Sequence, residues 1–404
     1  GGAFIWMSQG GSEEAARGET SEEAARGDSS EEEDKTSSKD TKGSGLAKLW
    51  TCDSSLSVPF LVDASLHPSG YKQVGTRCFL EDKEVGADLR GLSSEALITA
   101  MKRQTGQHLA FRIDPQALQD DAVFHHLKGL EDKTLALDLE RLDASAVTRL
   151  LALKDLDLYL LLRGHEASAL IELKAHPRLK GLSFWQSRDV DDQTLSALSD
   201  ASSLVMLSLF ETAISDAGLS HLSKMSGLRS LGLPKTKVGD AGLSHLSGLT
   251  ALQELYLSKT KVSDAGLVHI AGLTNLSSLY LAYTKVSSAG LVHLMGLTNL
   301  SSLKLNDTKV SDAGLVHIAG LTNLSSLKLY KTKVSGAGLV HLMGLSELRE
   351  LHLGATKVSD AGLVHLSGLK ALKTIYLGGT TVTDVGLSHL TDLTALENLY
   401  VWGT

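Results

Sequence analysis

The sequence lacks the residues and patterns that mark several large classes of protein. It has only two cysteines, Cys52 and Cys78, and their spacing matches no zinc motif, which needs four ligands at short intervals. No apolar run approaches the ~18 residues that a membrane-spanning helix needs, so no span is predicted. Phosphate-binding loops, nucleophile elbows and metalloprotease helices are also missing. We therefore expect no enzymatic activity, no cofactor and no bound metal.

An excess of positive charge is lacking as well. The chain carries a net charge of −8, and residues 1–45, with 11 acidic and 5 basic side chains, account for −6 of it. The remaining −2 gives no broad electrostatic basis for binding nucleic acid. The composition of residues 1–45, in which SEEAARG occurs twice, predicts a disordered acidic tail, either a solubilising spacer or an interaction segment.

The two cysteines leave a question open. A disulfide between Cys52 and Cys78 would staple an N-terminal cap and imply an oxidising compartment, and two buried free thiols are the alternative. Residues 46–105 are predicted to form this cap. Its pattern indicates short strands with turns, followed by a capped helix that ends near Gly106.

What the sequence has in abundance is internal repetition. Leucine or isoleucine recurs with a period of 24 positions from Leu207 to Leu399. Regular repeats fill residues 204–404, and less regular ones precede them in residues 106–203. In the repeat 274–297, alternating apolar residues predict a half-buried strand. The apolar spacing that follows predicts a helix, with Ser287 or Ser288 as its N-cap.

One strand and one helix in every repeat determine the architecture. Neighbouring strands must be parallel, and their crossovers right-handed. Each unit has apolar side chains worth roughly 10–20 kcal/mol when buried, whereas ordering its backbone costs roughly 24–48 kcal/mol. A single unit should therefore not fold alone. Stacked units should form a right-handed, curved α/β solenoid with a parallel sheet on its concave face.

The pattern LxxLxLxxTxVxDAGLxHLxGL resembles the leucine-rich-repeat family. It is most similar to the F-box-associated subfamily in a bacterial form, in which threonine stands where the subfamily usually has cysteine. The resemblance implies a horseshoe that binds a partner, without specifying one activity. It slightly favours export, to the periplasm, the cell surface or the medium, over the cytoplasm, and a start without Met fits this.

Differences between nearly identical repeats point to a binding surface. Repeats 274–297 and 322–345 differ at four of 24 positions, and three of these flank the inward leucines of the strand. Seven of the eight tyrosines occupy such positions, and tyrosine beside lysine is typical of binding hot spots. Ordinary cross-strand packing is the alternative explanation. The concave surface predicted to bind a protein, or alternatively a glycan, consists of Trp185, Phe210, Tyr256, Tyr280, Tyr283, Lys304, Asp307, Lys328, Tyr330, Lys331, His352, Tyr376, Tyr400 and Trp402.

Three other residue types keep the same period. Histidines at His221 to His389 are expected on the outer helices, too far apart for easy chelation, and copying of the repeat explains them without metal. Lysines from Lys237 to Lys357 form either a solvated edge, partly neutralised by aspartates three residues later, or a track for a polyanion. Threonine hydroxyls are expected to bond to neighbouring turns where strands end.

Two further functions remain as alternatives. The F-box-type resemblance suggests a substrate receptor of a ubiquitin ligase, although residues 46–105 contain no recognisable F-box. The last repeat stops at Thr404 without its helical half, which would expose core residues. This suggests a surface or assembly component in which another copy, or a capping partner, covers that end.

Overall fold

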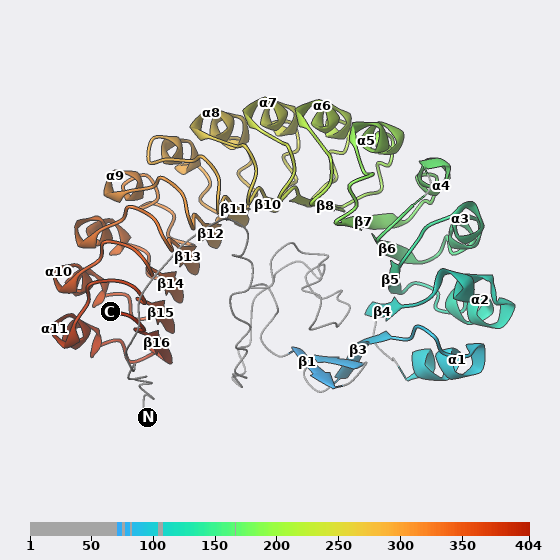
Figure 1. Ribbon diagram of the computed structural model, residues 1–404, viewed down its shortest axis with the longest axis horizontal. Coiled ribbons are helices and arrows are strands. Elements are labelled where there is room, and N and C mark those ends of the chain that lie inside the picture. Colours follow the sequence, from blue (N-terminus) through green and yellow to red (C-terminus); the bar gives the residue numbers. More distant parts are fainter. Residues whose placement is uncertain (1–70, 75–76, 81–82, 104–107, 166) are drawn as a thin grey trace, which may run out of the picture.

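The computed structural model describes residues 71–74, 77–80, 83–103, 108–165 and 167–404. In Figure 1 these residues follow an open arc, with strands along its inner side and helices along its outer side. All strands in this part of the chain belong to one sheet, in which their spatial order equals their order in the sequence. No helix of the described ranges is long and apolar enough to cross a membrane. The predicted acidic tail and Cys52 lie outside these ranges.

The sheet starts antiparallel and continues parallel. Its first three strands, paired antiparallel, are β1 (Tyr71–Val74), β2 (Arg77–Leu80) and β3 (Lys83–Asp88). From β3 onward each neighbouring pair is parallel. The next strands are β4 (His108–Arg112), β5 (Thr134–Leu139), β6 (Asp157–Leu162), β7 (Leu179–Trp185) and β8 (Met206–Phe210). Three-residue strands complete the sheet: β9 (Ser230–Gly232), β10 (Glu254–Tyr256), β11 (Ser278–Tyr280), β12 (Ser302–Lys304), β13 (Ser326–Lys328), β14 (Glu350–His352), β15 (Thr374–Tyr376) and β16 (Asn398–Tyr400).

The outer layer changes from helices of several turns to single turns. The longer α-helices are α1 (Ser94–Lys102), α2 (Asp121–Lys128), α3 (Ala144–Leu151), α4 (Ala167–Leu173) and α5 (Asp192–Leu198). The regular repeats carry α6 (Asp216–Leu219), α7 (Asp240–Leu243), α8 (Asp264–Leu267), α9 (Asp312–Leu315), α10 (Asp360–Leu363) and α11 (Asp384–Leu387). The 3-10 helices are η3 (Pro115–Gln119), η4 (Ser220–Leu222), η5 (Ser244–Leu246), η6 (Val268–Ile270), η7 (Gly290–Leu294), η8 (Gly336–Leu342), η9 (Val364–Leu366) and η10 (Ser388–Leu390).

Strand alternation decides which side chains enter the core. In the pair β10–β11, Leu255 stands opposite Leu279, and Tyr256 stands opposite Tyr280. The two leucines belong to one hydrophobic cluster that extends from Leu89 to Leu393. The two tyrosines do not belong to it, because successive side chains of a strand point to opposite faces. The predicted leucine core between strands and helices is therefore confirmed.

The threonine ladder stabilises each turn from within its own repeat. Thr308 Oγ1 donates to the carbonyl oxygen of Leu305 at 2.7 Å, and Thr284 Oγ1 donates to that of Leu281 at 2.6 Å. The bond forms where the strand ends, as expected, but its acceptor lies in the threonine's own turn rather than in a neighbouring one. The strand ends just before this segment, so the free carbonyl of the same chain segment is the acceptor within reach.

Neighbouring repeats are joined instead by an aspartate ladder. Asp264 Oδ1 accepts from the N–H of Ser287 at 2.7 Å, and its Oδ2 accepts from the Ser287 hydroxyl at 2.5 Å. The glycine that follows permits this approach, since a Cβ on Gly290 would collide with the Asp264 carboxylate and lie 3.0 Å from its Cα. Bidentate acceptance by a charged group is the strong form of a hydrogen bond, so this contact couples one repeat to the next.

The helical half of a regular repeat is short, and its form depends on whether the segment begins with aspartate. Six regular repeats begin their helical segment with Asp and form one α-helical turn. In the repeats where Ser288 and Gly336 replace it, only the 3-10 helices η7 and η8 form. An acidic residue in the first turn favours the α-helix through the helix dipole. Ser288 still accepts from the N–H of Ser311 at 2.9 Å.

Candidate partner-binding surface

One column of side chains runs along the non-leucine face of the regular repeats. The register of β10 to β16 aligns one residue of each strand with one residue of the next, in the predicted order. The column consists of Tyr256, Tyr280, Lys304, Lys328, His352, Tyr376 and Tyr400. Neighbours touch: the Tyr256 and Tyr280 ring centroids are 4.8 Å apart, and Lys304 Nζ lies 4.0 Å from the Tyr280 centroid.

The prediction that these side chains are open to solvent is wrong for the first half of the column. Tyr256 and Tyr280 are 2% and 1% exposed, and Lys304 and Lys328 are also buried. On the inner side of a curved sheet, side chains about 4.8 Å apart converge and cover one another. Their position off the leucine face is as predicted, but their accessibility is not.

Accessibility rises toward the C-terminal part of the column. Tyr400 is 40% exposed and Trp402 is 59% exposed. The Tyr376 ring lies between His352 and Tyr400, at centroid distances of 3.8 and 4.3 Å, and is within 5° of parallel to the Tyr400 ring. The indole of Trp402 rests on Gly378, where any Cβ would collide with it. This stack presents an aromatic surface at the end of the described sheet.

The other predicted residues lie beside the column rather than in it. Tyr330 follows β13 and rests on Gly354, where a Cβ would lie 3.1 Å from its ring. Tyr283, Asp307 and Lys331 occupy the turn after each strand, with φ values of 58°, 52° and 54°. Placing them on the strands was wrong, because the left-handed turn carries them to the rim of the sheet.

Residues of this turn make contacts across repeats. Lys331 Nζ lies 2.7 Å from Oδ2 of Asp307, which holds the same position in the preceding repeat. Lys259 Nζ lies 4.9 Å from the Tyr283 ring centroid, and Tyr283 is itself exposed. Exposed ion pairs of this kind contribute little to stability, so these side chains remain available to a partner.

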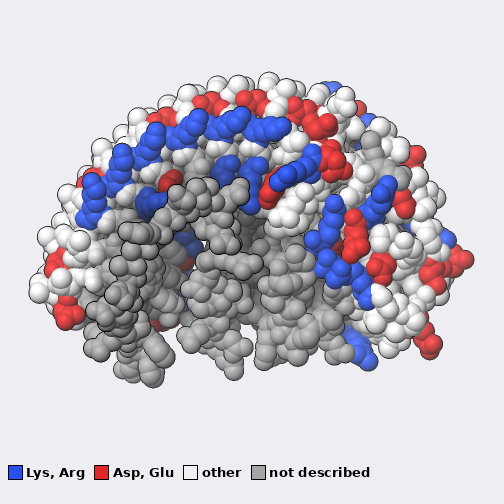
Figure 2. All heavy atoms as spheres, in the orientation of Figure 1, with Lys and Arg blue, Asp and Glu red and all other residues white. Residues whose placement is uncertain are grey.

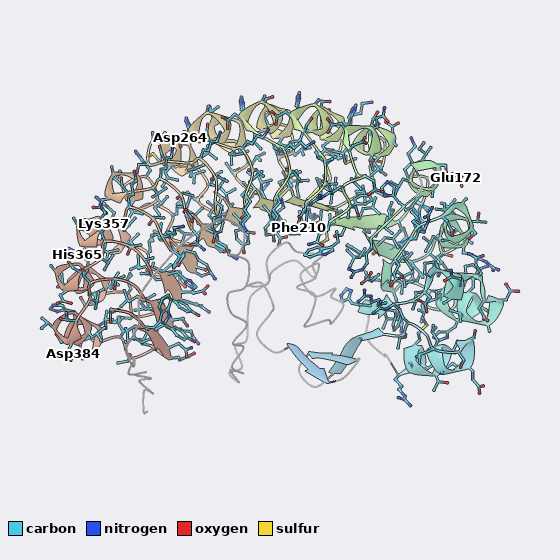
Figure 3. The ribbon with its side chains drawn as sticks, viewed as in Figure 1. Glu172, Phe210, Asp264, Lys357, His365 and Asp384 are labelled. Carbon is cyan, nitrogen blue, oxygen red and sulfur yellow. The ribbon has the colours of Figure 1, made fainter. Side chains whose placement is uncertain are left out.

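A second aromatic pair lies toward the N-terminal side. Trp185 and Phe210, the last residues of β7 and β8, stack with ring centroids 4.4 Å apart and an interplanar angle of 15°. Lys235 Nζ lies 4.9 Å from the Phe210 centroid and 3.0 Å from Glu211 Oε2. Figure 3 shows Phe210 on the inner side of the arc. This pair is separated from the Tyr376–Tyr400 stack by the buried half of the column.

A partly buried charged cluster lies between the two, and sequence reasoning missed its glutamate. Glu350 Oε1 contacts His352 Nε2 at 2.7 Å and Lys328 Nζ at 3.1 Å, and Glu350 Oε2 accepts from the Ser326 hydroxyl at 2.7 Å. Burial alone would raise the pKa of Glu350. Hydrogen bonds from His352 and Ser326, with the charge of Lys328, outweigh burial and hold the pKa well below its usual range. Glu350 is therefore a carboxylate at neutral pH.

Glu254 occupies the equivalent position of β10 and behaves in the opposite way. Its Oε2 accepts from the Ser230 hydroxyl at 2.8 Å and from the Tyr256 hydroxyl at 3.2 Å. Burial raises its pKa, and these neutral donors offset burial only in part. The signal for both residues was visible in the sequence, because a glutamate stands at 254 and 350 where the repeats between them have serine.

The histidine row lies on the outer helical side, as expected, and Figure 3 shows His365 there. Among the described residues, no three His, Cys, Asp or Glu side chains are grouped so that they could hold a metal ion. The backbone of Cys78 lies in β2, and whether it pairs with Cys52 stays a prediction.

Comparison with solved structures identifies the fold. An internalin (inlF) of Listeria monocytogenes superposes with a TM-score of 0.54 over 78% of this chain and 86% of its own, at 22% sequence identity. The fold is that of a leucine-rich-repeat solenoid. A second similar structure, internalin C2 of the same species, has a TM-score of 0.43 and 28% identity over 52% of this chain and 84% of its own. Neither a protein-family model nor a curated protein matches the sequence.

In this leucine-rich-repeat solenoid, the two sides of the sheet carry different groups. The described helices cover one side of the sheet and leave the concave side to the column and the two aromatic pairs (Figure 1). The candidate surface therefore lies on the concave face and its rim, with its most accessible aromatic residues at Trp402, Tyr283 and Tyr400.

Proposed function

We propose that this chain is a non-enzymatic binding protein that holds a partner protein against the C-terminal part of its concave face. The observation that carries the proposal is the exposed aromatic surface formed by Tyr376, Tyr400 and Trp402 on a sheet side that no described helix covers. Exposed aromatic anchors with a polar surround are the usual centre of protein interfaces.

The buried half of the column gives this surface a rigid support. Tyr280, Lys304 and the Glu350 cluster are held by neighbours from adjacent repeats, so little side-chain entropy is lost when a partner binds nearby. The rim residues Tyr283 and Lys331 add accessible polar contacts beside the support. A partner that follows the arc would touch several repeats at once.

A substrate receptor of a ubiquitin ligase would also bind a protein, so this alternative is a special case of the proposed function. No contact among the described residues favours it over other protein partners, so the proposal stays with the broader function. Catalysis is not proposed, because Glu350 holds His352, Lys328 and the Ser326 hydroxyl in one set of mutual contacts, which accounts for each of these groups structurally.

The double substitution Tyr400→Ala/Trp402→Ala should weaken binding of the partner by about 30-fold or more, since even one hot-spot aromatic contributes about 2 kcal/mol or more. The partner is first isolated with the full-length protein and then titrated in purified form. The melting temperature should change little, because both side chains are at least 40% exposed and neither belongs to the leucine core.

Val292→Ala/Val316→Ala is the matched control. Both valines are exposed on the helical side, so this variant should bind with unchanged affinity. Equal loss of affinity in the two variants would place the contact elsewhere and refute the proposal.

A further inference from the structure

A row of six lysines runs along one edge of the regular repeats, away from the concave column. All six are exposed: Lys237, Lys261, Lys285, Lys309, Lys333 and Lys357. The backbone N–H of Lys261 donates to the carbonyl of Val238 in the preceding repeat at 2.8 Å, and Lys285 donates to Val262 at 2.9 Å. This ladder sets successive lysines about 4.8 Å apart. Figure 2 shows basic side chains following the arc as a continuous line.

Within the described ranges these lysines have no acidic partner, although neighbouring repeats contain carboxylates. None of the six forms an ion pair in the described part of the chain, where other lysines such as Lys331 and Lys373 do. The aspartates expected to neutralise the row accept hydrogen bonds from the next repeat instead, as Asp264 does from Ser287. The partial neutralisation expected from these aspartates thus involves no direct ion pair among the described residues.

Aspartate does not follow every lysine of the row in the sequence. Asp240, Asp264, Asp312 and Asp360 follow four of the lysines at the third position. After Lys285 and Lys333 that position holds Ser288 and Gly336 instead. The two lysines that lack an aspartate at this sequence position therefore lie on either side of Lys309, each one repeat away from it.

We infer that the lysine row binds a linear sulfated polysaccharide. Single exposed lysines bind anions weakly, so only a polymer that engages several at once can gain affinity from the row. A pyranose unit is about as long as the ~4.8 Å step between neighbouring strands, so one sulfate can meet one lysine. No position of the row is aromatic, so it offers nothing on which nucleic-acid bases could stack.

The test uses the full-length protein, heparin as the sulfated polysaccharide, and desulfated heparin and single-stranded poly-dT as comparisons. Lys285→Glu/Lys333→Glu should weaken heparin binding by about tenfold or more and flatten its dependence on salt, because released counterions drive such binding. Lys128→Glu/Lys154→Glu, which changes two exposed lysines of the N-terminal repeats, is the control of equal charge and should bind like the parent.

Three results would overturn the inference. They are equal losses in the two double variants, binding of desulfated heparin as tight as that of heparin, and binding of poly-dT as tight as that of heparin. Unchanged melting temperatures show that the variants are folded. The Tyr400→Ala/Trp402→Ala variant should retain heparin binding, which separates this surface from the concave one.

Discussion

Gly290→Ala should lower the free energy of unfolding by about 2–4 kcal/mol, although alanine is normally the better helix former by about 0.5–1 kcal/mol. A Cβ on Gly290 would collide with the Asp264 carboxylate and press on its Cα at 3.0 Å. Moving the carboxylate breaks its two hydrogen bonds to Ser287, at about 1 kcal/mol each. Overpacking adds about 1–3 kcal/mol. Chemical unfolding followed by circular dichroism measures the change.

Gly296→Ala is the matched control in the same repeat. A Cβ there would meet no atom within 4 Å, and its φ is not left-handed. This substitution should be neutral or stabilise the protein by about 0.4–1 kcal/mol, because it restricts the unfolded chain. If the two alanine variants unfold at the same denaturant concentration, the glycines are not required by the aspartate ladder.

Glu350→Gln should destabilise the protein by about 3 kcal/mol at pH 7, and the loss should fade on acidification. The substitution leaves Lys328, whose side chain is 9% exposed, without its carboxylate. Breaking a buried pair costs about 3–5 kcal/mol, and we take the low end because the Glu350 side chain is one-third exposed.

The direction with pH follows from the lowered pKa of Glu350. The carboxylate contributes its full stabilisation above the unfolded pKa of about 4.3, and loses it as pH falls toward the lower folded pKa. The parent and the variant should therefore converge below about pH 4. Thermal melts of both proteins between acidic and neutral pH test this, and a gap that stays constant over the range would contradict it.

Glu254→Gln, at the equivalent position of β10, should change the stability at neutral pH in the opposite direction. Burial raises the pKa of Glu254, so ionisation disfavours the folded state as pH rises from the unfolded pKa through the folded one. An amide can still accept from the Ser230 hydroxyl. The variant should thus equal the parent in stability at low pH and match or exceed it at pH 7.

The fold could be predicted because the 24-residue period and the geometry of strands both require parallel strands that are stacked in register. Leucines such as Leu255 and Leu279 recur once in every repeat, and only parallel stacking in register brings them into one core. The order of the column from Tyr256 to Tyr400 followed from the same register. The repeated glycine at Gly290 indicated close packing between repeats, but the sequence alone did not show that Asp264 is the group packed against it, because that contact depends on the distance between them.

The candidate surface was only partly predictable, for two physical reasons. Alternation indicates the face on which a side chain lies, but curvature and neighbouring rings determine whether solvent reaches it, as Tyr280 and Tyr400 show. A two-residue period also fails where a strand ends. Lys331 follows a three-residue strand and takes a left-handed turn conformation, which no apolar pattern encodes.

The most direct test of the account is to map which face of the solenoid touches the partner. A photoreactive amino acid is placed at Trp402 on the concave side, and separately at Val316 on the helical side, in the full-length protein in its native cells. We expect irradiation to attach the partner protein that was isolated for the titration when the photoreactive residue is at position 402. We expect no attachment of that protein when it is at position 316. Attachment of that partner at Val316, with none at Trp402, would contradict the central claim.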